Sequence, residues 1–239
     1  MRQHAVWDEP ATSPSNKPMN TANLIFDLDG TLIDSAPSIL ACMEHVSAAA
    51  GLELALPLDA NLIGPPLLTA LARVTGLSDE RLLLPLAEAF KAHYDAVGLH
   101  STVPYPEIPE VLRYLRDKGM ALYLATNKRM IPTIAILEKM GWGEWFTAIY
   151  TLDKTSPGYT NKSAMLGLLL RENKIDPVTA VYVGDTREDG IAAAASGLHF
   201  IAADWGYGNF DDWPGVASWS RATTPSALLD ELRCARNVG

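Results

Sequence analysis

Short apolar runs alternate with helical patterns along most of the chain. Five runs have the length and composition of buried strands in a parallel sheet, at residues 23–27, 120–125, 147–151, 180–184 and 198–202. Apolar residues at three- and four-residue spacing predict helices at 108–118, 131–140, 163–172, 188–196 and 226–235. Alternating strands and helices are typical of an α/β fold with a doubly wound, parallel, Rossmann-like sheet.

The interval between the first two strands breaks this alternation. From Ser35 to Val103 the pattern is helical only, with helices expected at 38–50, 66–75 and 79–97. A simple crossover between parallel strands needs about a dozen residues. We therefore expect an all-helical insertion at residues 36–103, within a core formed by residues 21–35 and 104–239.

Composition and charge limit the classes of partner. The 239 residues are 48% hydrophobic and 20% charged, as in soluble globular proteins. The net charge of −9 and the absence of Lys/Arg runs disfavour a nucleic-acid partner. No apolar stretch reaches the roughly 18 residues of a membrane span, and the pattern therefore predicts no membrane partner. Monomer and homodimer both remain open.

Two further features bear on the cellular compartment. Cys42 and Cys234 are the only cysteines, which suits a reducing compartment, and we expect a cytoplasmic protein. Residues 1–20 hold three prolines among Ser, Thr and Asn, without the continuous apolar core of a signal peptide. This segment is expected to be a disordered leader.

Acidic residues follow the first strand directly. Asp27 and Asp29 are two residues apart, and Gly30 lets the backbone turn after them. Such a pair can divide the roles of nucleophile and proton carrier. An ordinary surface turn is the structural alternative, because Asp and Gly are common turn residues.

Polar groups occur at three later positions, two at the ends of predicted strands and one at the start of a predicted helix. Thr126 and Asn127 can offer a hydroxyl and an N–H to an anion, or can cap a helix. Asp185 and Asp189 can hold a hard cation, or can cap a helix. Lys162 begins a helix, and its alternative role is a solvated surface charge. Because parallel strands end at one edge of the sheet, the conjunction favours a common site.

The motifs around these residues resemble those of the haloacid dehalogenase-like hydrolases, over nearly everything from Leu24 to about Leu232. Residues 26–35, 124–128 and 183–189 resemble the first, second and fourth family motifs. Residues 63–67, 105–110 and 205–208 are similar to the branch of phosphoglycolate phosphatases and 5′-nucleotidases with a small helical cap. The third motif is usually Lys-Pro, whereas Lys162 is followed by Ser163. Lys162 is therefore assigned by position, and Lys154 is the competing candidate.

The resemblance implies a Mg²⁺-dependent phosphomonoester hydrolase that forms an aspartyl-phosphate and acts on a small phosphorylated metabolite. Asp27 would be the nucleophile and Asp29 the general acid and base. The remaining implied roles are metal binding by Asp27, the Asp29 backbone carbonyl and Asp185, phosphate binding by Thr126, Asn127, Lys162 and Gly30, orientation of Lys162 or a metal-bound water by Asp189, and substrate specificity by Gly64 and Pro65 in the cap loop.

Charge repulsion explains why such a site needs cations. At about 3 Å and an effective dielectric of about 20, two unit negative charges repel by roughly 5 kcal/mol. A carboxylate that attacks a phosphate therefore needs Mg²⁺ and a lysine beside it.

Several activities are compatible with these motifs. By resemblance 2-phosphoglycolate is the leading substrate, and a nucleoside monophosphate, pyrophosphate or a sugar phosphate is an alternative. A β-phosphoglucomutase-like phosphomutase and a binding protein without turnover are further alternatives. Asp29 disfavours dehalogenation, which needs no proton for its leaving group. Lys91 is the only lysine of the insertion, in a solvated helix pattern that disfavours phosphonate cleavage.

Overall fold

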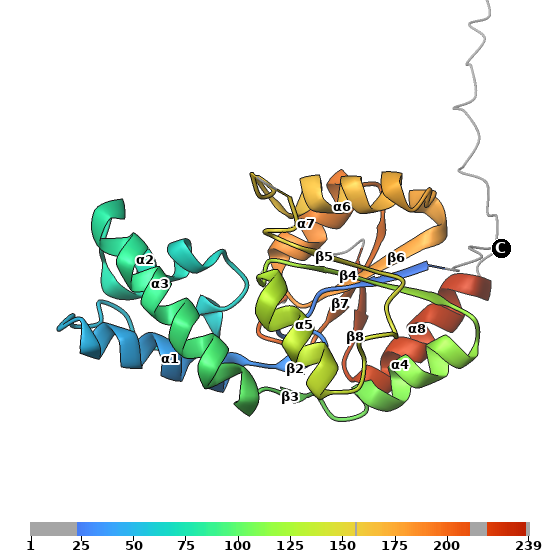
Figure 1. Ribbon diagram of the computed structural model, residues 1–239. Coiled ribbons are helices and arrows are strands. Elements are labelled where there is room, and N and C mark those ends of the chain that lie inside the picture. Colours follow the sequence, from blue (N-terminus) through green and yellow to red (C-terminus); the bar gives the residue numbers. More distant parts are fainter. Residues whose placement is uncertain (1–22, 156, 211–218, 238–239) are drawn as a thin grey trace, which may run out of the picture.

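The centre of the molecule is a six-stranded sheet with the order β5-β4-β1-β6-β7-β8 (Figure 1). The computed structural model describes residues 23–155, 157–210 and 219–237; the expected leader lies outside these ranges. The strands are β1 (Asn23–Phe26), β4 (Ala121–Thr126), β5 (Ala148–Thr151), β6 (Ala180–Gly184), β7 (His199–Ala203) and β8 (Ser220–Ala222). All neighbours are parallel.

The five predicted strands are present, and β8 is an addition. The sequence pattern does not predict β8, because Ser220, Arg221 and Ala222 do not form an apolar run. This segment is a strand because it pairs with β7, which the local sequence does not indicate.

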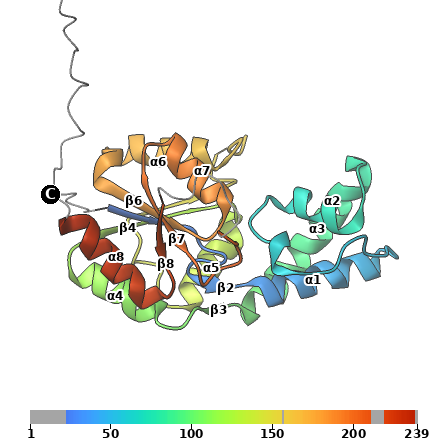
Figure 2. The same ribbon diagram turned by 180° about the vertical axis from the view of Figure 1, so that it is seen from behind.

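Helices cover both faces of the sheet (Figures 1 and 2). On one face lie α4 (Ile108–Asp117), α5 (Met130–Lys139) and α8 (Pro225–Asn237), and on the other lie α6 (Lys162–Glu172) and α7 (Arg187–Ala195). The short turn η3 (Pro177–Thr179) connects α6 to β6. Side chains alternate along β1, so that Leu24 and Phe26 pack into one core and Ile25 into the other. The predicted doubly wound, Rossmann-like fold is confirmed.

The cap, residues 36–103, stands beside the carboxyl edge of the sheet (Figures 1 and 2). Its helices are α1 (Ala36–Ala49), α2 (Leu67–Thr75) and α3 (Glu80–Ala96), with the short turns η1 (Ala60–Leu62) and η2 (Gly98–Ser101). Val46, Leu86 and Phe90 are among the buried side chains that pack α1 against α3. That cap and core form separate, mobile domains stays a prediction.

The two connections between cap and core form a small antiparallel ribbon. Strand β2 (Ile33–Asp34) pairs with β3 (Val103–Pro104), with Ile33 opposite Pro104 and Asp34 opposite Val103. The expectation of helix only from Ser35 to Val103 is therefore wrong at its last residue. Two-residue strands are too short to leave a periodic signal in the sequence.

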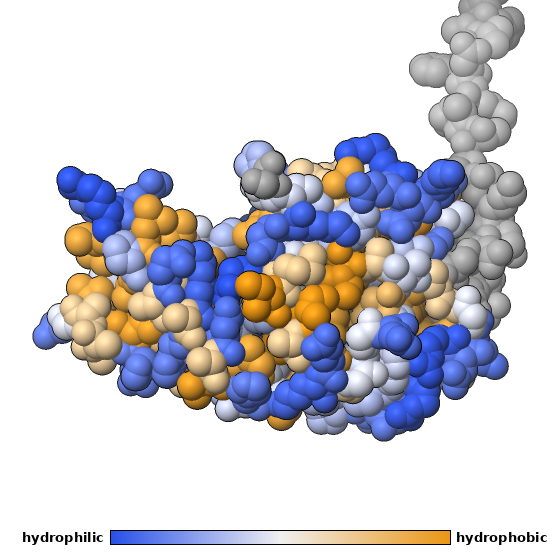
Figure 3. All heavy atoms as spheres, viewed as in Figure 1, coloured by the Kyte–Doolittle hydropathy of each residue, from blue (hydrophilic) through white to orange (hydrophobic). Residues whose placement is uncertain are grey.

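Apolar surface is visible over both the cap and the core (Figure 3). The exposed large hydrophobic side chains include Leu82 and Leu84 of α3 and Ile131 of α5. No helix in the described part of the chain combines the length and the apolar character needed to cross a bilayer.

Candidate active site

Asp27 lies directly after β1, at the carboxyl edge of the sheet. Its N–H donates to the carbonyl of Val183, which continues the pairing of β1 with β6. The side chain is buried, at 3% exposure, and its Oδ1 has no hydrogen-bond partner. Burial raises the pKa of Asp27 to about 7; Lys162 opposes this shift, and the charges of Asp189 and Asp29 add to it. The unpartnered oxygen points to a ligand that the protein alone does not supply.

Lys162 faces Asp27 from the first position of α6. Asn161 caps this helix by accepting from the N–H of Ala164, which starts α6 at the lysine. The Lys162 ammonium lies 3.1 Å from Asp27 Oδ2 and 2.5 Å from Asp189 Oδ1, at 2% exposure. Burial disfavours its charge, but the carboxylates of Asp189 and Asp27 outweigh burial and raise the pKa of Lys162. A solvated surface role is excluded.

The structure brings Lys162, rather than Lys154, to the acidic residues. Lys154 is exposed, donates to the carbonyl of Ile149 and lies over the Tyr150 ring. It is therefore not the lysine beside Asp27.

Asp189 holds Lys162 in place with a carboxylate whose two oxygens are both fully used. Oδ1 accepts from Lys162 and from the hydroxyl of Tyr182, and Oδ2 accepts from the N–H and the hydroxyl of Thr186. Thr186 caps α7, and Asp189 completes a capping box. Burial would raise the pKa of Asp189, but Lys162 and these donors lower it. Asp189 is thus a capping residue and also positions Lys162.

Asp185 sits in a space that glycines keep open. Oδ1 accepts from the hydroxyl of Thr31 at 3.1 Å, and Oδ2 accepts from the N–H of Tyr207 at 2.8 Å. A Cβ at Gly30 would lie 2.0 Å from Asp185 Oδ2, and one at Gly206 would lie 2.2 Å from Asp185 Cβ. Burial, together with the charges of Asp189 and Asp27, raises the pKa of Asp185 well above its usual range.

The expected role of Gly30 is not supported. Its N–H donates to the carbonyl of Ile33 at 2.9 Å and is therefore not free for a phosphate. At φ +83°, Gly30 instead makes the turn that lets Asp185 approach.

The acidic cluster fits a hard divalent cation. Carboxylate oxygens of Asp27, Asp185 and Asp189 lie within 4.8 Å of one another. Because Asp189 is committed to its four donors, Asp27 and Asp185 are the carboxylates left for a metal. Their mutual repulsion and the unpartnered Asp27 Oδ1 are relieved by an oxygen-preferring ion such as Mg²⁺.

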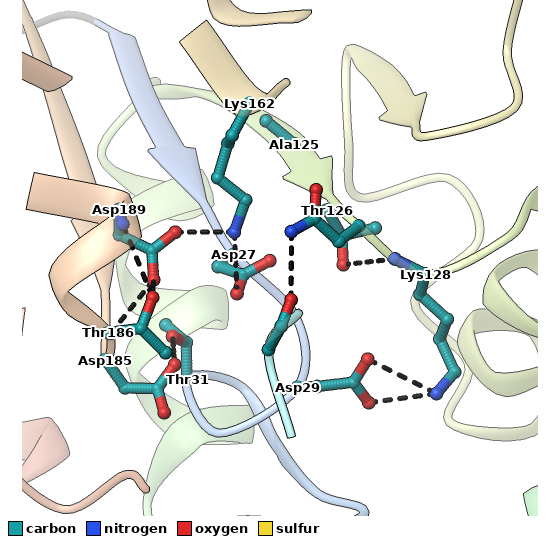
Figure 4. A network of polar contacts seen from close by, with 12 residues as sticks. Asp27, Asp29, Thr31, Ala125, Thr126, Lys128, Lys162, Asp185, Thr186 and Asp189 are labelled. Carbon is teal, nitrogen blue, oxygen red and sulfur yellow. Dashed lines mark hydrogen bonds and ion pairs between the residues drawn. The ribbon is translucent and has the colours of Figure 1, made fainter. Parts of the chain in front are cut away.

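Asp29 points away from Asp27, toward Lys128 (Figure 4). Its oxygens lie 2.9 and 3.3 Å from the Lys128 ammonium, and Oδ1 also accepts from the hydroxyl of Ser35 at 2.5 Å. The Asp29 side chain is thus outside the acidic cluster. Sequence reasoning gave Lys128 no role, although it stands in the same motif as Thr126.

Thr126 is the last residue of β4 and Asn127 follows it, and neither caps a helix. The N-cap of α5 is Arg129, which excludes the capping alternative for both. Thr126 Oγ1 accepts from the N–H of Lys128, which leaves its O–H available to an anion. The Asn127 amide donates to the carbonyl of Gly64 in the cap at 2.9 Å. Asn127 therefore holds the cap loop in this arrangement.

A cavity lies between the cap and the core over these groups. Core residues Asp27, Asp29 and Thr126 line one side, and the cap supplies a largely apolar wall. The residues of that wall include Ile39, Met43, Leu62, Gly64, Pro65 and Phe90. The two candidate specificity residues, Gly64 and Pro65, thus face the cavity.

Comparison with known proteins fits this geometry. A sequence profile of the haloacid dehalogenase-like hydrolases matches residues 24–203. This range includes all three residues of the acidic cluster, Asp27, Asp185 and Asp189. The chain belongs to this family. The motifs predicted a phosphatase of this family. The family, the fold and the assignment as a phosphatase are confirmed.

Relatives of this haloacid dehalogenase-like hydrolase have different names. Phosphoglycolate phosphatase of Agrobacterium fabrum is 33% identical over 77% of this chain and 80% of its own. A 5′-nucleotidase of Pseudomonas aeruginosa is 29% identical over 90% and 94%. The structure of protein tyrosine kinase A from Mycobacterium tuberculosis superimposes with a TM-score of 0.75 at 29% identity, covering 89% and 98%. Similarity at this level establishes the family but does not identify the substrate, which has to be inferred from the site.

Proposed function

We propose that the protein is a Mg²⁺-dependent phosphomonoester hydrolase that forms an aspartyl-phosphate on Asp27. One observation carries the proposal. Asp27 has one buried oxygen without a partner and the other beside Lys162, at the edge of the sheet where Asp185 directly follows β6. This arrangement suits a carboxylate nucleophile between two cationic groups.

In the first half of the reaction an oxygen of Asp27 attacks phosphorus. The ester P–O bond breaks, its electron pair stays on the leaving oxygen, and Asp29 donates a proton to that oxygen. Lys162 and the hydroxyl of Thr126 stabilise charge on the phosphoryl oxygens. Asp29 has to turn from Lys128 toward the substrate for this step.

In the second half a water oxygen attacks the phosphorus of the aspartyl-phosphate. Asp29 takes a proton from this water, and the bond between phosphorus and Asp27 breaks. Inorganic phosphate leaves, and the Asp27 carboxylate and the protonated Asp29 are regenerated.

Asp27 and Asp185, with the backbone carbonyl of Asp29, would hold the Mg²⁺ ion. When bound, the ion supplies positive charge against a repulsion of roughly 5 kcal/mol per pair of unit charges. Asp189 keeps Lys162 oriented rather than binding the ion itself.

The substrate is a small phosphorylated metabolite, and 2-phosphoglycolate is our first candidate, supported by the Agrobacterium relative. A nucleoside monophosphate is the second candidate, supported by the Pseudomonas relative and by the apolar cavity wall. We further propose a cytoplasmic location, since Cys42 is a free, buried thiol.

A substrate screen with a matched nucleophile variant tests this function. Purified protein with Mg²⁺ is assayed for phosphate release from 2-phosphoglycolate, nucleoside monophosphates, pyrophosphate and hexose phosphates, and hexose products are checked for transfer between hydroxyls. Asp27→Asn is nearly isosteric and should lose at least about a thousandfold in rate. Hydrolysis by Asp27→Asn at more than about a thousandth of the wild-type rate would exclude Asp27 as the nucleophile.

A further inference from the structure

Lys128 joins the proposed proton carrier to the cap. Its side chain is 6% exposed, and its ammonium lies 2.9 Å from Asp29 Oδ1. The same ammonium lies 4.6 Å from the centre of the Tyr94 ring, on cap helix α3. Burial disfavours the charge of Lys128, but Asp29 and Tyr94 raise its pKa. Lys128 is therefore a buried cation with a single carboxylate partner.

The neighbouring cation, Arg129, is bound differently. Its two terminal nitrogens contact both oxygens of Asp95 on the cap, at 2.6 and 3.1 Å. This bidentate pair uses the planar end of the guanidinium and joins core to cap without touching Asp29. Arg129 is thus already matched by a partner that has no part in the proposed reaction.

Lys128 is the cation of this cavity that an incoming anion can reach by exchange. Among the described residues that line the cavity, the cations are Lys128 and Arg129, and most of the cap wall is apolar. An anionic group in such a cavity loses water and needs a cationic partner. Replacing Asp29 on Lys128 by another carboxylate keeps the charge balance around the lysine unchanged.

We propose that Lys128 recognises an anionic group on the alcohol part of the substrate, and that this group displaces Asp29 from Lys128. The proposal rests on the proposed function and narrows its substrate class to esters with a carboxylate close to the phosphate. The exchange makes and breaks ion pairs and no covalent bond. Once displaced, Asp29 takes up a proton from water and turns toward the phosphoryl group, so that recognition and release of the proton carrier are one event.

The exchange explains how one pocket can discriminate between phosphate esters by their rates of hydrolysis. An ester with a neutral alcohol part leaves Asp29 on Lys128, turned away from Asp27 (Figure 4). An ester with an adjacent carboxylate frees Asp29. Selection then acts on the transition state as well as on binding, which is the form of discrimination that raises kcat.

Equilibrium binding to variants that cannot turn over tests the exchange. All variants carry Asp27→Asn, and isothermal titration calorimetry in a large excess of Mg²⁺, which offsets the lost Asp27 charge, compares 2-phosphoglycolate with 2-hydroxyethyl phosphate, which has an alcohol in place of the carboxylate. The observable is the ratio of the two dissociation constants, which cancels effects on the shared phosphate. Adding Lys128→Met should reduce the preference for 2-phosphoglycolate roughly 10- to 100-fold, the value of a charge-assisted hydrogen bond.

Removal of the competitor should have the opposite effect. Adding Asp29→Asn leaves Lys128 without its carboxylate, and the preference for 2-phosphoglycolate should rise about tenfold or more. Lys128→Arg should keep most of the preference, since the cation is retained. Arg129→Met is the matched control, because it removes a cavity cation that does not contact Asp29, and it should change both dissociation constants alike.

Two results would overturn the exchange. One is a ratio that Lys128→Met leaves unchanged within about twofold. The other is a ratio that Lys128→Met and Arg129→Met shift equally, which would indicate general electrostatics of the cavity. Failure of the proposed function looks different: with Mg²⁺ the wild-type protein would then release phosphate from none of the esters, nor from the small acyl phosphate acetyl phosphate.

Discussion

The ammonium of Lys162 lies 2.5 Å from Asp189 Oδ1, and both side chains are buried. The pair joins the start of α6 to the start of α7, across the edge where β1 and β6 end. Its cation also faces Asp27. The lysine is therefore both part of the fold and part of the proposed chemistry.

Lys162→Met should cost both stability and turnover. It leaves buried carboxylates without their cation, and the free energy of unfolding should fall by about 3–5 kcal/mol at pH 8 without Mg²⁺. Phosphate release should fall by at least about a hundredfold. Urea unfolding and a phosphatase assay measure the two effects.

Lys154→Met is the matched control for this experiment. Lys154 is exposed, and its replacement should change stability by less than about 1 kcal/mol and leave turnover unchanged. A large loss of turnover in Lys154→Met, with Lys162→Met still active, would transfer the motif role to Lys154.

Stability of the metal-free protein should fall as the pH rises through about 7. Burial raises the pKa of Asp27 to about 7 in the folded state, while an unfolded aspartate keeps a pKa near 3.8. Between these values the folded state binds more protons than the unfolded state, so the slope of stability with pH is negative. Asp27→Asn removes this proton and should be more stable than wild type at pH 8.5, with a smaller difference at pH 5.5.

Thermal unfolding from pH 5.5 to 8.5 in EDTA measures this effect. His199 has its pKa lowered by burial and contributes with the opposite sign, which is why the variant is compared with wild type at each pH. A difference in melting temperature between wild type and Asp27→Asn that does not grow with pH would contradict the raised pKa of Asp27.

Asp185→Asn should abolish high-affinity Mg²⁺ binding. The amide cannot supply the second negative charge that, with Asp27, attracts the ion. One of the two oxygens becomes an N–H₂, which then faces one of the donors to Asp185, either the hydroxyl of Thr31 or the N–H of Tyr207. Calorimetric titration with Mg²⁺ measures the loss, and EDTA should abolish wild-type turnover. Unchanged Mg²⁺ affinity in Asp185→Asn, or full activity in excess EDTA, would remove the metal from this site.

Gly64→Ala should impair hydrolysis of 2-phosphoglycolate more than that of acetyl phosphate. Gly64 has φ +108°, and a Cβ there would lie 3.2 Å from the methyl group of Thr186. The cap loop, whose Gly64 carbonyl accepts from Asn127, must then shift, and kcat/KM for 2-phosphoglycolate should fall about ten- to a hundredfold.

Gly51→Ala is the control for backbone strain alone. Gly51 also has a positive φ, +67°, but no atom lies within 4 Å of its added Cβ. It should lose some stability and keep both activities. Equal losses for both substrates in Gly64→Ala would place specificity in a core loop such as residues 205–208.

The sequence predicted the acidic groups because the information for them is local. Asp27 and Asp185 each directly follow an apolar run, and parallel strands bring such positions to one edge. Lys162 was placed by the same reasoning from the start of its helix. Helix capping was the structural alternative for both Asp185 and Asp189; Asp189 does take part in a capping box, whereas Asp185 does not cap the helix, since Thr186 is the N-cap.

The contacts of Asp29 could not be predicted in this way. Its partner Lys128 is 99 residues away in sequence, and the direction of its carboxylate depends on side-chain rotation around a turn. The steric role of Gly30 beside Asp185 could not be predicted for a related reason: a glycine in a motif indicates a turn, whereas the close approach of Asp185 depends on the tertiary structure. The pairing that defines β8 is likewise tertiary.

The ribbon of β2 and β3 makes the cap exchangeable. Asp34 and Val103 are directly paired, so the chain leaves the core and returns to it at neighbouring points. A tight turn could therefore join them without stretching the core, and a cap of different length could be grafted at the same two residues. A cap exchanged at this junction would replace the apolar wall of the cavity and leave Asp27, Asp185 and Lys162 within the retained core.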